Sequence, residues 1–254
     1  MSESLGVVVP AYEPDIEALL AYIDDIRATL DPATVRVEID APTDAVRSRI
    51  EPVVDELGVA AQRRGKGGAV MDGFDELSTD LLAFADADGS VPAASLADIV
   101  DHVRQRADTV AIGSRRHPDA KIVDHQTVGR RLLGDAFAFV ARQLLPTRCY
   151  DYQCGAKALR AAAWADIHHY CYEEGFAWDL EFLSVADSLG YGISEIPVRW
   201  EDHPESTVDP ASAAVELATA LVRVRQRTGR LSPRRPRDRQ SADRSAPMQL
   251  RDEY

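Results

Sequence analysis

The chain has 254 residues, which is enough for one large domain, or for one domain with an extension. It contains 42 acidic and 29 basic residues, and this net charge of -13 argues against nucleic acid as the main partner. The sequence contains no apolar run of 18 residues and no signal-peptide pattern near the first residue, so we expect a cytoplasmic protein, either soluble or peripheral to the membrane.

Strands and helices are expected to alternate in the first half of the chain. The pattern predicts strands at 5–9, 34–39, 59–62, 81–85 and 109–113, and helices at 15–30, 44–57, 67–77 and 94–106. Such alternation is typical of an α/β fold with a parallel sheet covered by helices. In these sheets ligands bind at the carboxyl ends of the strands. The residues expected at that edge are Pro10, Asp40, Asp86 and Ser114.

The second half is expected to be mainly helical. The predicted helices lie at 129–145, 161–169, 176–189 and 210–227, with a polar segment at 151–157 and a last strand at 193–200. Residues 228–254 are rich in Arg, Pro and Ser and show no periodicity, which indicates a disordered tail. We therefore expect one domain over 1–209, an amphipathic helix at 210–227 and a tail at 228–254.

Two carboxylates follow the predicted strand 81–85. Asp86 and Asp88 are separated by one residue, and Gly89 comes next. Carboxylate oxygens are preferred ligands of Mg²⁺ and Mn²⁺, which often bridge a protein to substrate phosphates. Asp and Gly also favour ordinary surface turns, so this segment alone leaves both interpretations open.

A glycine-rich turn, Arg64-Gly65-Lys66-Gly67-Gly68, precedes the predicted helix 67–77. Backbone N–H groups at the start of a helix favour a phosphate group, and the Lys66 ammonium would add a positive charge. The spacing differs from that of a P-loop. A solvated loop lysine is the alternative.

In this order and spacing, the segments of the chain resemble family 2 glycosyltransferases of the GT-A fold. The likeness is greatest to the branch that places glucose or mannose on dolichyl phosphate, and it runs from about residue 6 to residue 208. The matching segments are 7–12, 39–44, 64–67, 86–90, 113–115, 151–157, 176–181 and 195–200. The segment Asp151-Tyr152-Gln153-Cys154-Gly155-Ala156-Lys157 is the most specific of them.

This resemblance implies an inverting, metal-dependent transfer of a hexose from a nucleotide diphosphate sugar to a polyprenyl or dolichyl phosphate. Asp86 and Asp88 would hold Mg²⁺ or Mn²⁺, and Ser90 would add a ligand directly or through water. The donor pocket would be lined by Pro10, Ala11, Tyr12, Asp40, Lys66, Asp86 and Arg115. A UDP-sugar is the favoured donor, and GDP-mannose remains open.

The resemblance also implies a set of residues at the reaction centre: Asp151, Asp88, Arg131 and Lys157. The residues that could meet the acceptor phosphate or the leaving diphosphate are Arg115, Arg130, Arg131 and Lys157, with surface ion pairs as the alternative. Asp151 is expected to orient the acceptor or to hold the metal shell, because an ionised phosphate needs little help from a base. Gln153, Asp179 and Glu181 would support the same wall.

Three departures from the family pattern concern the donor. Glu13-Pro14 stands where Asn-Glu is common, Ala41 replaces a second acid, and Thr207 stands where a lysine often contacts phosphate. A role of Asp40 in reading the base, or as a simple turn acid, therefore remains open.

The charge of the chain is unevenly distributed. From Arg223 onward ten arginines face four acidic residues, a net charge of +6, whereas residues 1–222 carry a net charge of -19. The basic end could bind anionic lipid headgroups, with a solvated tail as the alternative. An acidic body with only three lysines suits a high-salt cytoplasm.

Two other functions are compatible with the sequence. One is transfer to a soluble acceptor, which would need a general base such as Asp151 or Asp179. The other is a catalytically silent protein that binds a nucleotide sugar, which the substitutions at Glu13, Ala41 and Thr207 suggest.

Overall fold

The structure is a computed structural model that describes residues 3–107, 109–123, 138–201 and 210–231. Its strands are β1 (Leu5–Tyr12), β2 (Thr34–Asp40), β3 (Glu56–Ala60), β4 (Leu81–Ala85), β5 (Thr109–Ser114), β6 (Lys121–Ile122), β7 (Ala156–Arg160), β8 (Gly192–Pro197) and β9 (Arg199–Trp200). Its helices are α1 (Ile16–Leu30), α2 (Asp44–Ile50), α3 (Lys66–Glu76), α4 (Ala93–Gln105), α6 (Ala161–Ile167), α7 (Trp178–Ser188) and α8 (Pro210–Thr228). Residues 138–144 are also helical.

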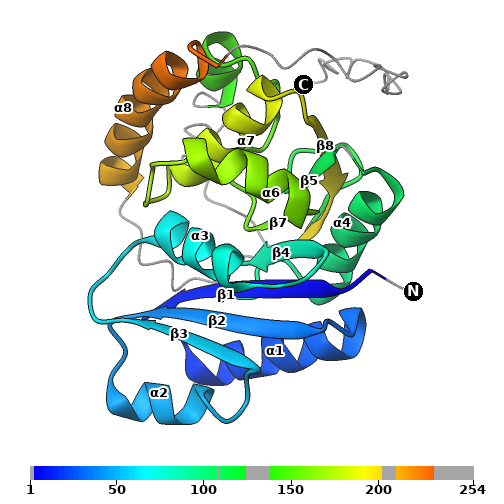
Figure 1. Cartoon of the computed structure of the whole chain (residues 1–254), viewed down its shortest axis with the longest axis vertical. Helices are drawn as coiled ribbons and strands as arrows, with labels where there is room; N and C mark the ends of the chain where they lie inside the picture. The colour runs from blue at the N-terminus through cyan, green and yellow to red at the C-terminus, as the bar shows by residue number, and fades with distance from the viewer. Residues whose placement is uncertain (1–2, 108, 124–137, 202–209, 232–254) are drawn as a thin grey trace.

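Seven strands form one sheet in the order β3-β2-β1-β4-β7-β5-β8 (Figure 1). Neighbouring strands are parallel except at β7, which runs antiparallel to both β4 and β5. The chain thus inserts a strand from its second half between two strands of its first half. The mostly parallel, helix-covered sheet expected from the sequence is confirmed.

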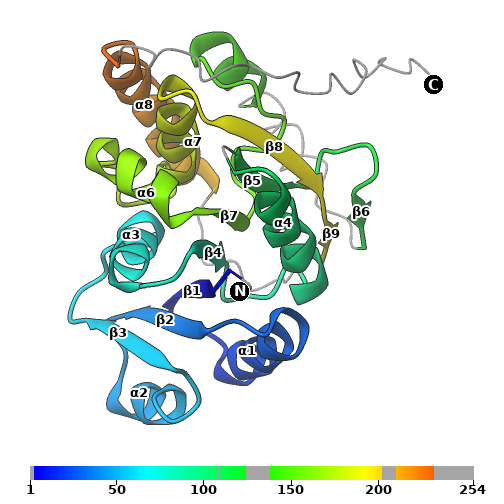
Figure 2. The ribbon, with the colours of Figure 1, turned by 45° about the vertical axis from the view of Figure 1, so that its right-hand side comes forward.

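Helices cover both faces of the sheet (Figure 2). Along β1, Val7 and Val9 pack in the cluster that contains α1 and α4, whereas Val8 packs in the cluster that contains α3, α6 and α7. Successive side chains of a strand point to opposite faces, so the central strands must be apolar on both sides. This requirement explains the continuous apolar runs in β1 and β4.

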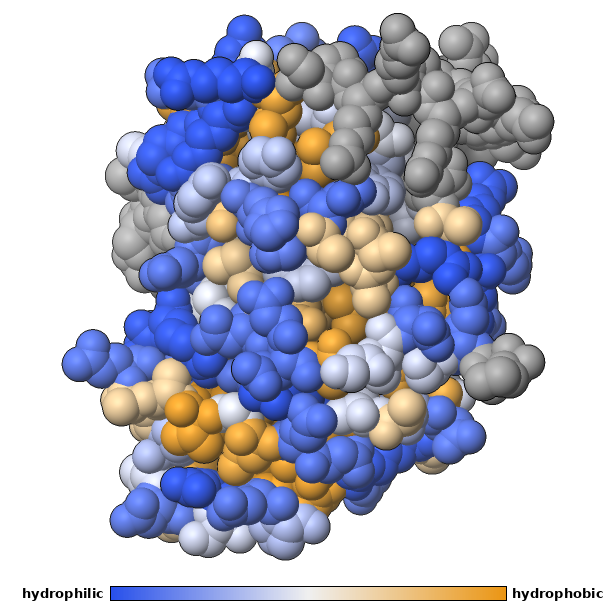
Figure 3. Space-filling view, in the orientation of Figure 1, coloured by the Kyte–Doolittle hydropathy of each residue, from blue (hydrophilic) through white to orange (hydrophobic). Residues whose placement is uncertain are grey.

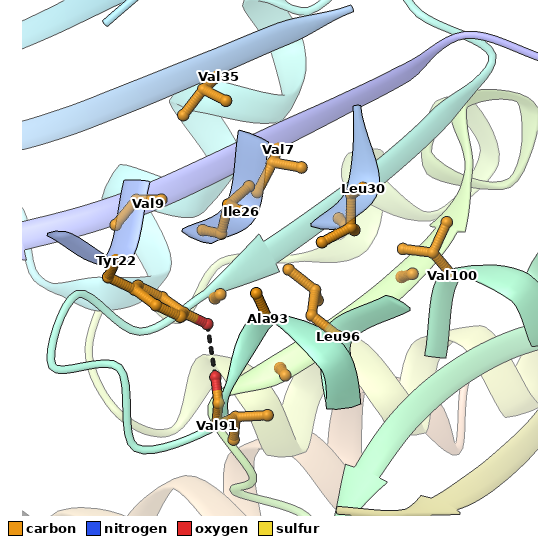
Figure 4. Packing of buried hydrophobic residues seen from close by; sticks show 14 of the residues in the cluster. Val7, Val9, Tyr22, Ile26, Leu30, Val35, Val91, Ala93, Leu96 and Val100 are labelled. Atoms are coloured by element: carbon orange, nitrogen blue, oxygen red, sulfur yellow. Dashed lines mark hydrogen bonds between the residues drawn. The ribbon is translucent and has the colours of Figure 1, made fainter. Parts of the chain in front are cut away.

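Helix α1 illustrates how the local sequence produces this packing. Asp15 caps the helix, and its carboxylate accepts a hydrogen bond from the N–H of Ala18 at 3.2 Å. The buried residues recur every three or four positions: Leu19, Tyr22, Ile23, Ile26 and Leu30. Figure 4 shows Tyr22 reaching across this core, where its hydroxyl donates to the carbonyl of Val91 at 2.6 Å. This bond ties α1 to the segment that leads into α4.

The prediction of one long helix at 44–57 is wrong. Helix α2 ends at Ile50, a turn follows, and β3 begins at Glu56 rather than at residue 59. Pro52 accounts for the early end, because proline has no N–H with which to continue the helical hydrogen bonds. The freed residues pair with β2 in register, Arg36 with Glu56 and Asp40 with Ala60.

Strand β7 was missed by the sequence pattern. The segment Ala156–Arg160 contains a lysine and an arginine, and neither periodicity nor β-branched residues indicate a strand there. Its burial depends on distant partners: Lys157 pairs with Asp179, and Arg160 pairs with Glu3. Such pairing makes it possible to place charged residues at the centre of a sheet.

Other boundaries also differ. The predicted strand 193–200 is divided into β8 and β9 after Pro197, which has no N–H to continue a ladder. The predicted helix 161–169 ends as α6 at Ile167 and continues as a short 3₁₀ turn. Of the predicted helix 129–145, residues 129–137 lie outside the described residues, as does most of the predicted tail 228–254.

Helix α8 packs on α7 with its apolar side. Leu217, Leu221 and Val224 are buried against the body of the protein, although Val222 is about half exposed. The part of α8 visible at the upper left of Figure 3 is hydrophilic. The apolar side of this amphipathic helix is therefore largely used in packing. No helix among the described residues could span a membrane. The boundaries at residues 209 and 227 stay a prediction.

The hydrogen bond of Tyr22 provides a test of the α1–α4 packing. We expect Tyr22→Phe to lower the free energy of unfolding by about 1–2 kcal/mol, because the buried carbonyl of Val91 would lose its partner. Tyr172→Phe is the matched control: this exposed hydroxyl donates to the carbonyl of His169, and we expect a change within about 0.5 kcal/mol. Urea unfolding curves of both variants would measure the difference, and equal curves would contradict the assignment.

Candidate active site

Of the residues predicted at the carboxyl ends of the strands, Asp40, Ser114 and Asp86 lie at one edge of the sheet, whereas Pro10 lies within β1, which continues to Tyr12. Tyr12 and Asp40, the last residues of β1 and β2, are paired in register. Asp86 directly follows β4, and Arg115 directly follows β5. This edge is where α/β sheets place their ligands, so its side chains are the candidate site.

Two lysines and two aspartates alternate in a row at the centre of this edge. The ammonium of Lys66 lies 3.0 Å from Oδ1 and 3.2 Å from Oδ2 of Asp86. It also lies 3.1 Å from Oδ2 of Asp179, whose Oδ1 lies 2.6 Å from the ammonium of Lys157. Side-chain exposure is 0% at Lys157 and 34% at Asp86. The row therefore leads from the core of the protein to its surface.

The pairing determines the charges in this row. Burial disfavours the charge on Lys66, but Asp179 and Asp86 outweigh this effect and raise its pKa. Burial likewise opposes the charge on Asp179, yet Lys157 and Lys66 lower its pKa. Burial raises the pKa of Asp86, and Lys66 opposes that change. The ring of Phe84 lies below both ammonium groups, at 5.0 Å and 5.4 Å from its centroid. The two ammonium groups of the row thus pack against an aromatic ring while their carboxylate partners keep them charged.

Lys157 is the buried end of this row. Its ammonium also donates to the carbonyl of Cys154 at 2.9 Å, and its side chain is fully enclosed. The sequence left open whether this lysine contacts a phosphate group or forms an ion pair. The structure gives it the position of a counter-ion that fixes Asp179, since no part of its side chain reaches the surface.

Asp86 and Asp88 lie in the turn after β4. The N–H of Asp86 donates to the carbonyl of Gly155 at 2.8 Å, and the N–H of Ser90 donates to Oδ1 of Asp88 at 2.9 Å. A Cβ atom at residue 155 would collide with the carboxylate of Asp86, so only glycine leaves room for it. The glycine of the most specific sequence segment is thus explained by the position of Asp86.

These two acids fit a divalent cation. Asp86 is partly exposed and Asp88 is exposed, and the charge of Asp88 contributes to the raised pKa of Asp86. A positive group, the Lys66 ammonium, already lies against both oxygens of Asp86. No group of three potential ligands occurs among the described side chains, so substrate phosphates or water would have to complete the shell.

Asp151 is paired with Arg115 beside this row. Its Oδ2 accepts from the N–H of Arg115 at 3.0 Å and from Nε at 2.7 Å, and its Oδ1 accepts from Nη2 at 2.8 Å. Burial opposes the charge on Asp151, but Arg115 outweighs it and holds the pKa well below its usual range. Arg116 lies 3.5 Å from Oδ1. The carboxylate of Asp151 is therefore a weak base. Its hydrogen bonds and its charge hold Arg115 and Arg116 in position.

Hydrogen bonds also fix the backbone around Asp151. The N–H groups of Tyr150 and Asp151 donate to Glu195 of β8, both at 2.9 Å, and the N–H of Gln153 donates to Oδ1 of Asp151 at 3.3 Å. Glu195 begins the segment 195–200, which resembles the family pattern. Its role in fixing the backbone before β7 could not be inferred from spacing, because 44 residues separate it from Asp151.

Asp40 supports the glycine-rich turn. Its Oδ2 accepts from the N–H groups of Arg64 at 2.7 Å and of Gly65 at 3.1 Å, and its Oδ1 accepts from Nε of Arg64 at 2.8 Å. Both carboxylate oxygens are thus engaged by the turn. Contact of Asp40 with a nucleotide base stays a prediction, and the observed partners match the alternative of a turn acid.

The glycines of this turn permit close contact with a second loop. Gly65 has φ of 91°, and a Cβ there would lie 2.6 Å from the carbonyl oxygen of Glu174. A Cβ on Gly67 would collide with Trp178. The N–H of Gly68 donates to the carbonyl of Glu174 at 3.0 Å. The turn that carries Lys66 is therefore fixed by the loop before α7.

The loop before α7 is in turn bound to α8 by salt bridges, which we call the clamp. Glu181 accepts from the N–H of Glu173 at 2.6 Å and from Nη1 of Arg227 at 2.5 Å. Arg223 donates to both carboxylate oxygens of Glu173, at 2.9 Å and 2.7 Å. The sequence analysis left a lipid surface or a solvated tail open for the basic end and missed this clamp. Their spacing of four residues, which places both on one helix face, was the available signal.

The other predicted donor residues lie at the end of β1. Pro10 and Tyr12 are partly buried and Ala11 is buried, and the guanidinium of Arg63 lies 4.1 Å from the ring centroid of Tyr12. Arg130 and Arg131, predicted to contact phosphate, lie outside the described residues.

Two of the departures noted in the sequence share a backbone feature. Glu13 and Ala41 follow β1 and β2 and have φ of 47° and 48°. Asparagine and aspartate tolerate this left-handed region better than other side chains do. The residues that are common in the family at these positions would therefore suit the observed backbone.

Comparisons with known proteins identify the family of the chain. The family model "Glycosyl transferase family 2" matches residues 6–165. The chain is 28% identical over 246 residues to dolichyl-phosphate beta-glucosyltransferase of Saccharomyces cerevisiae, covering 87% of this chain and 74% of that protein. It is 26% identical to glycosyltransferase AglD of Haloferax volcanii, covering 86% of this chain but 36% of that protein.

A solved structure shows the same fold. It is glucosyl-3-phosphoglycerate synthase from Mycobacterium tuberculosis, in complex with Mn²⁺, uridine diphosphate and glucosyl-3-phosphoglycerate. The TM-score is 0.65 at 17% identity, and the match covers 90% of this chain and 81% of that chain. The GT-A fold expected from the sequence is confirmed.

The pair of Asp151 and Arg115 gives a prediction on pH dependence. We expect Asp151→Asn to lower the free energy of unfolding at pH 7 by roughly 3 kcal/mol, because it leaves a buried arginine without its counter-ion. The stability from a lowered aspartate pKa is present above about pH 4 and is lost as the pH falls through the folded-state pKa. The difference between the two proteins should therefore shrink below about pH 4.

Denaturant unfolding between pH 7 and pH 3 would measure this difference. Asp119→Asn serves as the control, since its side chain is 81% exposed, and we expect a change within about 0.5 kcal/mol. A difference for Asp151→Asn that stays constant over this pH range would show that the charge of the carboxylate is not its source.

Proposed function

Since the chain belongs to glycosyl transferase family 2, we propose that it transfers glucose from a UDP-sugar to a dolichyl or polyprenyl phosphate. That it is a glycosyltransferase follows from the family. The acceptor is supported by the relatives named dolichyl-phosphate beta-glucosyltransferase, of which the chain covers about three quarters. GDP-mannose is the second candidate donor.

The pairing of the acids is the observation that best supports a phosphate acceptor. A hydroxyl acceptor would need a base, whereas a phosphate near neutral pH is already mostly ionised. The two acids considered as bases, Asp151 and Asp179, are both buried in ion pairs with cations, and their pKa values are lowered. Acids in this state are poor proton acceptors. This argues against transfer to a soluble hydroxyl acceptor.

The donor would bind at the ends of β1, β2 and β4. We assign its nucleotide to Pro10, Ala11 and Tyr12, and its diphosphate to Lys66 and to a divalent cation held by Asp86 and Asp88. When bound, the cation supplies Lewis-acid stabilisation of the leaving diphosphate. The Mn²⁺ and uridine diphosphate named for the mycobacterial enzyme of similar fold support this assignment.

The acceptor phosphate would be met by arginine. Arg115 and Arg116 are aimed by Asp151 at the same edge, and a guanidinium suits planar contact with phosphate oxygens. A phosphate oxygen would form the new bond to the anomeric carbon while the bond from that carbon to the donor diphosphate breaks. No proton is transferred. Direct displacement inverts the anomeric configuration.

The acceptor places the reaction at a bilayer surface. We propose that the protein acts as a peripheral protein on the cytoplasmic face, with the basic chain end attracted to anionic headgroups. Arg223 and Arg227 are used in the clamp on Glu173. The arginines from residue 230 onward are therefore the main candidates.

A transfer assay tests the reaction. Radiolabelled UDP-glucose, UDP-N-acetylglucosamine, UDP-glucuronate and GDP-mannose would each be incubated with dolichyl phosphate and Mn²⁺ or Mg²⁺. We expect a lipid-soluble product from UDP-glucose and none after EDTA treatment. Asp88→Asn should lower turnover roughly 10²-fold or more, because a ligand of the charge-stabilising cation is lost.

The control is Asp98→Asn, an exposed aspartate on α4 away from this edge, which should leave turnover unchanged. A lipid-soluble product from GDP-mannose alone would replace the donor in this proposal. Product formation that survives EDTA, or that is equal in Asp88→Asn, would contradict the metal site. Donor binding without any lipid-soluble product would favour a soluble acceptor or a silent binding protein.

A further inference from the structure

Lys66 engages both oxygens of Asp86, the carboxylate that we propose as a metal ligand. Its ammonium is almost equally distant from the two carboxylate oxygens, at 3.0 Å and 3.2 Å. A divalent cation on the same carboxylate would be strongly repelled by an ammonium in that place. The two positive groups therefore compete for Asp86 in the protein without donor.

We propose that Lys66 neutralises Asp86 while the nucleotide is absent and moves to the donor diphosphate when the donor binds. The exchange would couple the two ligands: the diphosphate withdraws Lys66 from Asp86, and the carboxylate becomes available to Mn²⁺ or Mg²⁺. This inference rests on the proposed function, because it takes Asp86 as a metal ligand and a nucleotide diphosphate as part of the donor.

The structure allows the side chain of Lys66 to move while its backbone stays in place. Its turn is fixed by Asp40, which accepts from two backbone N–H groups, and by the bond from Gly68 to Glu174. Only the end of the side chain is free to exchange partners. The side chain of Lys66 is 12% exposed, whereas that of Lys157 is not exposed at all.

Asp179 would keep the lysine at the site during the exchange. It lies 3.1 Å from the ammonium of Lys66 and is itself held by Lys157 at 2.6 Å. Lys66 can therefore release Asp86 without losing every counter-ion. The same arrangement predicts that the protein still folds when Lys66 is replaced, because Asp179 keeps Lys157 as its partner.

The test is a measurement of Mn²⁺ affinity, with and without nucleotide. Free Mn²⁺ would be followed by electron paramagnetic resonance during titration of wild type and Lys66→Met, first alone and then with UDP or GDP, whichever the protein binds. Without nucleotide, we expect Lys66→Met to bind Mn²⁺ about tenfold more tightly, because one positive charge beside the site is removed. The increase in Mn²⁺ affinity caused by nucleotide should fall by about the same factor.

Lys121→Met is the matched control, because the chain has three lysines and this one is exposed on β6, away from the row. It should bind Mn²⁺ like wild type in both conditions. Lys66→Gln serves as a second uncharged variant if Lys66→Met does not fold, which circular dichroism would reveal. Unchanged or weaker Mn²⁺ binding by the folded uncharged variant without nucleotide would overturn the inference.

Two further variants separate this inference from the proposed function. Asp86→Asn and Asp88→Asn should weaken Mn²⁺ binding in the presence of nucleotide. If they do not, the metal site itself is misplaced and the proposed function fails at that point. If they do, and the variant at Lys66 shows wild-type coupling, only the exchange of Lys66 is refuted.

Discussion

The buried ion pair between Lys157 and Asp179 is the constraint on which the candidate site depends. The fully buried ammonium of Lys157 depends on Asp179, since an unpaired buried charge is strongly destabilising. The pair joins β7 to α7, and through Lys66 it reaches α3 and the end of β4. Four elements from distant parts of the chain are thus fixed relative to one another at one point of the sheet edge.

Acids at this edge serve mainly to place cations. Asp40 orients Arg64, Asp151 orients Arg115, and Glu181 binds Arg227. In each pair the acid is more deeply buried than its basic partner, so the positive end is the one nearer to solvent. A protein with a strongly negative body can in this way present a positive group such as Arg115 where a phosphate is proposed to bind. Its net charge alone does not reveal that local arrangement.

The sequence predicted most of the first half of the fold, because buried parallel strands and amphipathic helices leave direct patterns such as Val7–Val9 and the periodic residues of α1. It also predicted Asp86, Lys66 and Asp151 as members of the candidate site. It could not predict β7, whose charged residues are stabilised by partners such as Asp179, 22 residues further on. The partner of each site acid could not be predicted for the same reason, because the pairing is a tertiary property that local spacing does not encode.

The insertion of β7 has a consequence for synthesis of the chain on the ribosome. Strands β1 to β5 are complete by residue 114, but β4 and β5 cannot join until residues 156–160 have emerged. During that interval an apolar strand has an unpaired edge, which is a site for wrong pairing and aggregation. The second half of the chain therefore completes the nascent sheet. Interruption of translation between residues 114 and 156 would leave a fragment that lacks β7, the strand between β4 and β5.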